Sequence, residues 1–159
     1  MLRRLPVLAF LLLPALGPAP ARAAAGAAAP IVAASDAWAR ATVEGQSGSG
    51  VYLRLSSRED AVLVGASSPA TDKVEIHEMR QVQDMMHMRR IERLALPAGK
   101  TVSLEHDFHI MLIGLRHQLK PGQTLALTLQ LLDAHGGHQT LALEVPVRPI
   151  DTPVPVRHD

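Results

Sequence analysis

The sequence contains no cysteine among its 159 residues. A blue-copper electron carrier needs a cysteine ligand, and thiol-disulfide exchange needs reactive thiols, so both classes of protein are excluded. We also expect no lipid anchor attached through cysteine. With no disulfide to constrain the chain, the stability of the folded state must come from the hydrophobic core alone.

Aromatic residues are also scarce, at 3% of the chain. Beyond the N-terminal segment there are only Trp38, Tyr52 and Phe108. This composition argues against an adhesion or carbohydrate-binding module, since we expect such modules to use exposed aromatic rings. Serines are present as candidate nucleophiles, but no nucleophile elbow or triad spacing accompanies them. We therefore expect a protein that is not an enzyme.

Long hydrophobic runs are absent except at the N-terminus. There, Arg3 and Arg4 precede an apolar run over residues 5–16, shorter than the roughly 20 residues that cross a bilayer. The segment ends in small residues and is typical of a cleaved secretory signal over residues 1–23. We expect an exported, soluble periplasmic protein that begins at Ala24, with no stable membrane insertion. A histidine-brace oxygenase is excluded, because it needs histidine at that position.

Charge of one sign is lacking too, because residues 24–159 carry 13 basic and 15 acidic residues, a net charge of about −2. No basic patch indicates a nucleic-acid partner. This length suits one domain with a genuine core. Composition predicts a flexible leader over residues 24–35, rich in alanine, glycine and proline, a domain over 36–148 and a proline-rich tail over 149–159.

Short segments of alternating polarity, separated by turn-forming residues, run through the expected domain. No segment sustains a helical period over three turns, so the pattern predicts a single all-β domain, a sandwich or a barrel. The expected strands cover residues 37–42, 51–56, 61–67, 73–79, 88–96, 101–105, 108–112, 124–132 and 139–147.

The sequence is rich in histidine and methionine over one stretch. Four of its eight histidines and five of its six methionines lie between His77 and Met111. Imidazole and thioether ligands without thiolate suit Cu(I). Because side chains alternate along a strand, His77 and Met79 share one face, and His109 and Met111 share another, each opposite the more apolar face. Two outward His-x-Met pairs predict a metal site near the surface.

Two further groups of residues have open roles. Residues 85–87, Met-Met-His, are expected in the turn of a hairpin that starts with residues 81–84, where they either contact a partner or bind metal. His135, His138 and His158 either form a weak secondary site that prefers Cu(II) or are solvated residues of a turn and the tail.

The histidine and methionine spacing resembles that of the periplasmic copper chaperones called PCu(A)C, whose pattern is His-x10-Met-x21-His-x-Met. Here ten residues separate His77 from Met88, and His109 and Met111 supply the closing pair. The resemblance implies that these four residues bind Cu(I).

The similarity extends from about Trp38 to Val147, through the stretches DKVEIHEM, MRRIERLALPAGKTVSLE and HIMLIGLRHQLKPGQTLALTLQL. It implies a cupredoxin-like Greek-key β-sandwich or barrel. It also implies a copper chaperone, which delivers Cu(I) to the copper-site subunit of cytochrome c oxidase or to another copper chaperone. The same ligands would also suit a periplasmic protein that buffers copper or confers resistance, and the sequence leaves delivery and buffering open.

The spacing departs from the family pattern by one residue, because 20 residues rather than 21 separate Met88 from His109. The shortening falls in the loop before the strand of His109, where a deletion is tolerated. It leaves His106 nearby as a substitute or additional ligand. We expect His109 to bind, because its spacing from Met111 puts both side chains on one face. Met79 is expected to assist as a neighbouring or transfer ligand.

Overall fold

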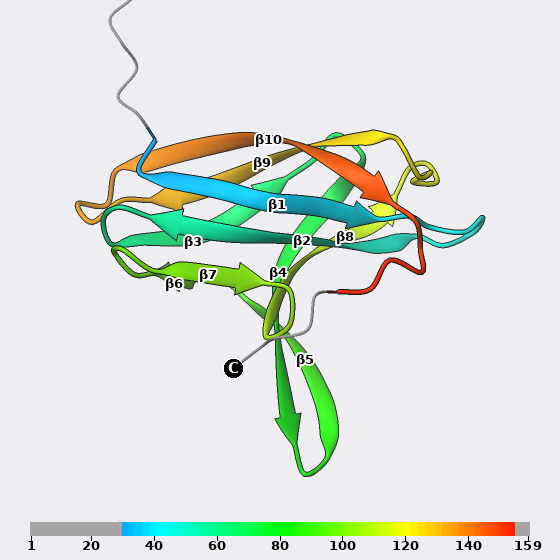
Figure 1. Cartoon of the computed structure of the whole chain (residues 1–159), viewed down its shortest axis with the longest axis horizontal. Coiled ribbons are helices and arrows are strands. Elements are labelled where there is room, and N and C mark those ends of the chain that lie inside the picture. The colour runs from blue at the N-terminus through cyan, green and yellow to red at the C-terminus, as the bar shows by residue number, and fades with distance from the viewer. Residues whose placement is uncertain (1–29, 155–159) are drawn as a thin grey trace, which may run out of the picture.

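The structure of the protein, a computed structural model, describes residues 30–154. The expected signal over residues 1–23 lies outside this range, as do residues 24–29 and 155–159. The described residues form ten strands and no helix (Figure 1). The strands are β1 (Val32–Arg40), β2 (Gly48–Ser57), β3 (Ala61–Ser67), β4 (Thr71–Val82), β5 (Met85–Ile91), β6 (Leu94–Leu96), β7 (Thr101–Leu104), β8 (Phe108–Leu115), β9 (Thr124–Leu132) and β10 (His138–Arg148).

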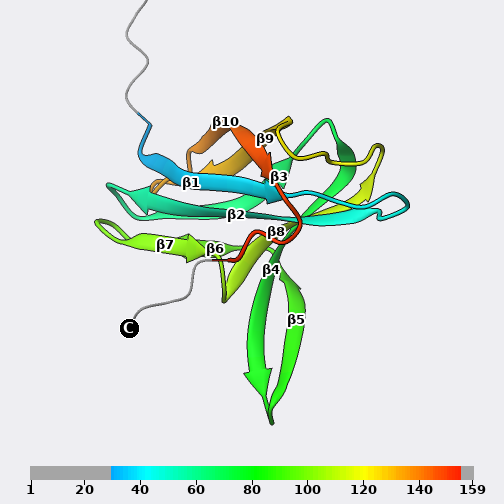
Figure 2. The ribbon, with the colours of Figure 1, turned by 45° about the vertical axis from the view of Figure 1, so that its right-hand side comes forward.

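The strands form two layers that share one continuous path of hydrogen bonding (Figures 1 and 2). The order along the path is β5-β4-β8-β2-β1-β10-β9-β3-β6, and β7 pairs with β2 beside it. The parallel pairing of β1 with β10 joins the two layers, and the other pairings are antiparallel. The expected all-β sandwich is therefore confirmed.

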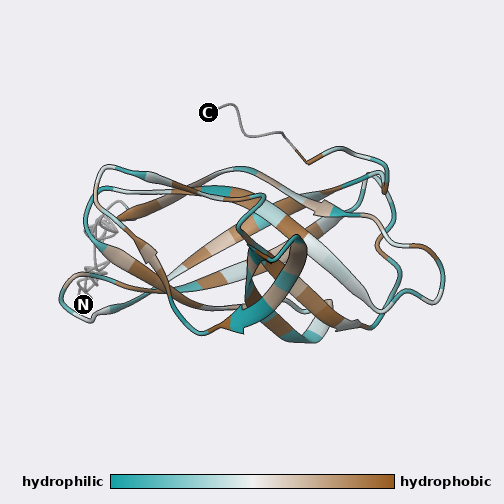
Figure 3. Ribbon diagram, turned by 90° about the horizontal axis from the view of Figure 1, so that it is seen from below, coloured by the Kyte–Doolittle hydropathy of each residue, from teal (hydrophilic) through white to brown (hydrophobic). Residues whose placement is uncertain are grey.

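The core lies between the layers and follows from the alternation of polarity along the strands. On β9 the leucines at 125, 127, 129 and 131 are buried, while the residues between them are exposed or half-buried. Figure 3 shows the same alternation as brown and teal segments along the strands. Each fully buried leucine contributes roughly 1.5–3 kcal/mol to folding. The buried faces of both layers meet in one cluster, which fixes which face of each strand remains outside.

Two differences from the expected elements change the organisation of the chain. Strand β1 begins at Val32, inside the segment predicted to be a flexible leader, because Val32 is buried and pairs with Ser57 of β2. The expected strand over 88–96 is two strands, since β5 pairs with β4 in one layer and β6 pairs with β3 in the other. The chain crosses between the layers at residues 92–93, a change of partner that alternation does not reveal.

Strands β4 and β5 form a hairpin that extends away from the body of the sandwich (Figures 1 and 2). Its turn consists of Gln83 and Asp84, which have positive φ angles of 49° and 61°. Positive φ at both central residues is the geometry of a two-residue turn that matches the twist of a hairpin. The prediction that residues 85–87 lie in the turn is therefore wrong, because Met85 already pairs with Val82 in the ladder.

Candidate metal centre

Two histidines from different strands face each other on the side of β4 and β8 that is turned away from the core, here called the outer face. His77 of β4 pairs directly with His109 of β8, and their ring centroids are 5.8 Å apart. The adjacent residues Ile76 and Ile110 are buried in the core cluster. Alternation therefore turns both imidazoles to the outer face.

Three methionines flank the two imidazoles on the same face. Met79, two residues after His77, pairs with Met88 across β4 and β5. Met111 lies two residues after His109 on β8, so it flanks the imidazoles on the side opposite to Met79 and Met88. Directly paired residues, and residues two apart on one strand, share a face. All five side chains therefore project from the outer face.

A cavity of about 540 Å³ lies over the outer face. His77 is not part of its wall and adjoins it through the neighbouring ring of His109. Val154, from the expected tail, also borders it. The histidines and methionines in the wall are Met79, Met86, Met88, His106, His109 and Met111, and the wall also contains Glu105 and Asp107.

The two histidines are more buried than a site at the surface would require. His109 is 8% exposed, and the side chain of His77 is 13% exposed. Aromatic rings continue from them across the outer face, since Tyr52 lies 6.4 Å from His109 and stacks on the buried Trp38 at 4.5 Å. Met88, by contrast, is 51% exposed. The site therefore has a buried imidazole end and an open thioether end.

Gly50 provides space next to Met111, its partner in the pairing of β2 with β8. A Cβ atom at this position would lie 2.9 Å from the hydroxyl oxygen of Tyr52. Both residues line the cavity. The absence of a side chain at Gly50 therefore allows the ring of Tyr52 to lie over the strand beside Met111.

Glu75 holds the ring of His77. Its Oε2 atom lies 2.8 Å from Nε2 of His77, while its Oε1 atom is 3.0 Å from Lys73 Nζ and 3.5 Å from a guanidinium nitrogen of Arg90. The hydrogen bond from His77, followed by that from Lys73, lowers the pKa of Glu75 below its ordinary value. An ionised carboxylate only accepts hydrogen bonds, so Nε2 of His77 donates to Glu75, and in the neutral imidazole the lone pair is then on Nδ1.

Nδ1 of His77 is buried and has no hydrogen-bond partner among the described residues. A buried polar atom without a partner is costly, and most such atoms in native proteins are paired. A neutral imidazole nitrogen is at the same time a ligand for copper. The arrangement of Glu75, His77 and an unpaired nitrogen is that of the carboxylate–histidine pairs that orient metal ligands.

His109 is kept neutral by its surroundings. Burial of its ring, followed by the nearby charge of His77, lowers the pKa of His109 below its ordinary value of 6.5. A protonated imidazole cannot bind a metal ion, whereas a neutral one can. The same burial that hides His109 from solvent therefore keeps its lone pair available at neutral pH.

His106 lies in the loop between β7 and β8, at the edge of the cavity. The backbone amide of Met79 donates to the carbonyl of Asp107 at 2.6 Å, which ties this loop to the base of the hairpin. Nε2 of His106 is buried and, like Nδ1 of His77, has no partner among residues 30–154. The loop thus adds a second unpaired imidazole nitrogen beside the cavity.

The site depends on methionine sulfur. Within the described range, no group of three or more histidine, aspartate or glutamate side chains has the arrangement of a metal site. Magnesium and calcium prefer oxygen ligands. Two imidazoles with thioethers are instead a donor set for a soft monovalent ion.

Sequence reasoning did not single out Glu75 or Tyr52 as part of the site. Glu75 could have been found, because it lies two residues before His77 and alternation puts both on one face. Met86 was expected in the turn, either to contact a partner or to bind metal, but it lies in β5 opposite Gln81. Tyr52 carries no sequence signal, because its position beside His109 depends on the pairing of separate strands.

Two further histidines of the described residues do not line the cavity. His135 and His138 are exposed at the turn between β9 and β10, where the backbone amides of His135 and Gly137 donate to the carboxylate of Asp133. These hydrogen bonds hold the pKa of Asp133 below its ordinary value, with that from Gly137 the largest cause. His158, the third residue of the expected secondary site, lies outside the described residues.

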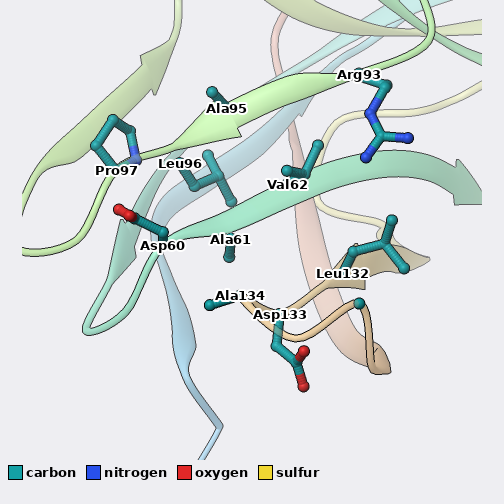
Figure 4. A pocket seen from close by; sticks show the side chains of 11 residues that line it. Asp60, Ala61, Val62, Arg93, Ala95, Leu96, Pro97, Leu132, Asp133 and Ala134 are labelled. Atoms are coloured by element: carbon teal, nitrogen blue, oxygen red, sulfur yellow. The ribbon is translucent and has the colours of Figure 1, made fainter.

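A second hollow, of about 430 Å³, opens between β3, β6 and the turn after β9 (Figure 4). Arg93, Asp60 and Asp133 are spaced around it, with small apolar side chains between them. Its wall contains no histidine or methionine. The hollow therefore does not provide the ligands of a copper site.

Solved structures show which fold this chain shares. The described residues contain no helix long and apolar enough to cross a bilayer. The fold matches that of the apo PCuAC domain of PmoF2, with a TM-score of 0.60 at 19% identity over 77% of this chain and 94% of that one. The copper-bound PCuAC domain of PmoF2 gives 0.59 over 77% and 97%. The expected cupredoxin-like fold is thus confirmed.

Sequence similarity then assigns the family. Residues 32–147 match the LpqE-like lipoprotein family, so the chain belongs to that family, within the PCu(A)C group that its spacing resembles. Lxx21020 of Leifsonia xyli subsp. xyli, which carries a lipoprotein name, is 30% identical over 138 residues, 86% of this chain and 78% of that protein. Cu(I)-loaded DR1885 of Deinococcus radiodurans is 29% identical, with a TM-score of 0.57 over 78% and 83%.

Proposed function

We propose that the protein is a periplasmic copper carrier, not an enzyme, that binds Cu(I) through His77, Met88, His109 and Met111. The observation that carries this proposal is the direct pairing of His77 with His109 on the outer face, with thioether side chains on either side of the pair. Shared fold supports it, since the related structures of PmoF2 and DR1885 are described as copper-bound.

The ligand set suits a carrier because all four ligands are neutral. Two imidazoles and two thioethers leave the ion with its single positive charge, whereas thiolates would bind Cu(I) more tightly. A neutral set can therefore give up its metal to a partner with stronger ligands. This chain has no cysteine, so it cannot form the tighter kind of site.

The path of release follows from the difference in exposure across the site. His109 is 8% exposed, whereas Met88 is 51% exposed on the hairpin. A partner can approach the thioether of Met88 without unfolding the sandwich, but it cannot approach His109 in that way. The ligands are then replaced in sequence, with Met88 the first to be exchanged and the imidazoles the last.

Glu75 prepares His77 for this role. Its carboxylate accepts a hydrogen bond from Nε2 of His77. This leaves Nδ1 of His77 as the atom that binds copper. The imidazole is held in one orientation before the metal arrives, which lowers the entropy lost on binding. Lys73 and Arg90 hold the other carboxylate oxygen, so Glu75 is itself fixed in place.

The receiving protein is proposed to be the copper-site subunit of cytochrome c oxidase or another copper chaperone. The same ligands would serve a protein that buffers copper in the periplasm. Deletion of the gene distinguishes the two roles. Loss of oxidase activity at limiting copper supports delivery, and increased sensitivity to excess copper supports buffering.

The ligand assignment is tested by titrating the protein with Cu(I) and measuring X-ray absorption at the copper edge. One bound equivalent should show two nitrogen and two sulfur ligands. A spectrum without nitrogen ligands, or absence of binding in competition with a chromophoric chelator, would contradict the proposal.

A further inference from the structure

Three potential ligands in the cavity remain outside the proposed four. Met79, Met86 and His106 border the same space as His109 and Met111. Met79 and His106 could each assist the inner four, as the sequence suggested. Met86 cannot do so, and the ladder of strand pairs shows the reason.

Strand pairing arranges the ligands in rows along the hairpin. His77 lies in the row of His109, Met79 in the row of Met88, and Gln81 in the row of Met86. Successive rows on one face are two residues apart, about 7 Å along the strand. Met86 therefore lies about 14 Å along the strand from the row of imidazoles, too far to share an ion with His109.

Met86 has partners nearer to it. Met79 lies one row away on the same face, and the loop that contains His106 is hydrogen-bonded to the backbone of Met79. Nε2 of His106 is buried and unpartnered within the described residues. Met79, Met86 and His106, which offer two thioethers and one imidazole, thus border one cavity outside the row of the two paired histidines.

We propose that Met79, Met86 and His106 form a second Cu(I) position, the outer site, through which copper enters and leaves the inner site. The inference rests on the proposed function, because it takes Cu(I) to be the cargo of the inner ligands. Three neutral ligands bind Cu(I) more weakly than four, and Met86 is 60% exposed. The outer site is therefore occupied second and emptied first.

The opposite face of the hairpin provides a matched comparison. Met85 is adjacent to Met86 and equally exposed at 60%, yet it does not line the cavity. On that face Glu78 is held by Arg80 at 2.8 Å and Arg89 at 2.7 Å. Residues 85 and 86 are thus both methionines with the same exposure. They differ in the face of the hairpin on which they lie, and so in their position relative to His106.

The test is an anaerobic titration of the protein with Cu(I), followed through the NMR signals of ¹³C-labelled methionine methyl groups. The first equivalent should shift Met88 and Met111. The second should shift Met79 and Met86, and Met85 should not move. Met86→Leu should weaken binding of the second equivalent at least tenfold, and His106→Leu should do the same, whereas Met85→Leu should leave both equivalents unchanged.

The outcomes separate the two proposals. Binding of one equivalent only, or equal effects of Met86→Leu and Met85→Leu, would overturn the outer site and leave the inner site standing. Shifts at Met79 and Met86 without shifts at Met88 and Met111 would overturn the inner assignment and retain the outer one. If no methyl signal moves at any copper concentration, the inner site and the outer site are both overturned.

Discussion

His77 and His109 face each other across β4 and β8, with ring centroids 5.8 Å apart. This pairing determines the geometry of the candidate site, because every other ligand position is counted from it along the strands. Met79 and Met88 lie one row towards the hairpin, and Met111 lies one row towards the body. The predictions below depend on this arrangement.

Removal of a proposed ligand at the exposed end of the site should weaken Cu(I) binding. Met88→Leu conserves volume at an exposed position, so we expect at least a tenfold loss of affinity with no change in the free energy of unfolding. Met85→Leu is its control, because Met85 lies on the opposite face. Competition with a chromophoric chelator measures the affinity, and equal affinities of the two variants would remove Met88 from the ligand set.

Glu75 should act through the orientation of His77. Glu75→Ala removes the acceptor for Nε2, so we expect a loss of Cu(I) affinity of about 10- to 100-fold. Glu75→Gln keeps an acceptor oxygen and should recover most of that affinity. In the metal-free protein, ¹⁵N NMR should show His77 protonated at Nε2, and a mixture of tautomers in Glu75→Ala. Lys73→Ala is the control, and protonation at Nδ1 in the native protein would contradict the assignment.

The stability of the metal-free protein should decrease in two steps as the pH falls. Burial lowers the pKa of His109 below 6.5, so below pH 6.5 the unfolded state binds a proton that the folded state resists, and stability decreases. The lowered pKa values of Glu75 and Glu78 stabilise the folded state above the ordinary value of 4.5, and this contribution is lost as the pH falls through the lower folded values. Denaturant unfolding at pH 8 to 3 measures both steps, and the first should be absent in His109→Phe.

Affinity for Cu(I) should also decline as the pH falls, because protons compete for the imidazole ligands. Since burial lowers the pKa of His109, competition at this residue sets in below pH 6.5. Chelator competition between pH 8 and 4 measures the profile. An affinity independent of pH across that range would indicate a site made of methionine alone.

Two substitutions in the hairpin turn should stabilise the folded protein. Gln83 and Asp84 both have positive φ, which asparagine and glycine adopt more readily. Gln83→Asn with Asp84→Gly should raise the free energy of unfolding by about 0.5–1 kcal/mol. Thermal unfolding monitors this, and a matched Glu44→Asn in another loop should not reproduce the gain.

Much of the fold could be predicted because alternation is a local property. Leucines at every second position of residues 124–132 are sufficient to predict a strand with one buried face, and β9 has these bounds. The prediction of one strand over 88–96 is wrong because the chain changes pairing partners between Ile91 and Leu94. A change of partner depends on residues elsewhere in the chain, which a local pattern cannot contain.

The candidate site divides in the same way. Alternation correctly put His77 and Met79 on one face, and His109 and Met111 on one face. It did not show that the two faces adjoin, that Tyr52 lies beside His109, or that residues 85–87 belong to a strand. The assignment of these side chains as ligands stays a prediction, to be tested by the experiments above.

The sequence by itself determined the all-β class, the outward direction of each His-x-Met pair and the exclusion of thiolate chemistry, because these follow from residue identity and a period of two. Only the tertiary structure decided the register that sets His77 against His109, and the burial that leaves one nitrogen of His77 and one of His106 without partners. Register is a property of hydrogen bonding between distant segments. Burial depends on which loops and rings cover a face once the strands have paired.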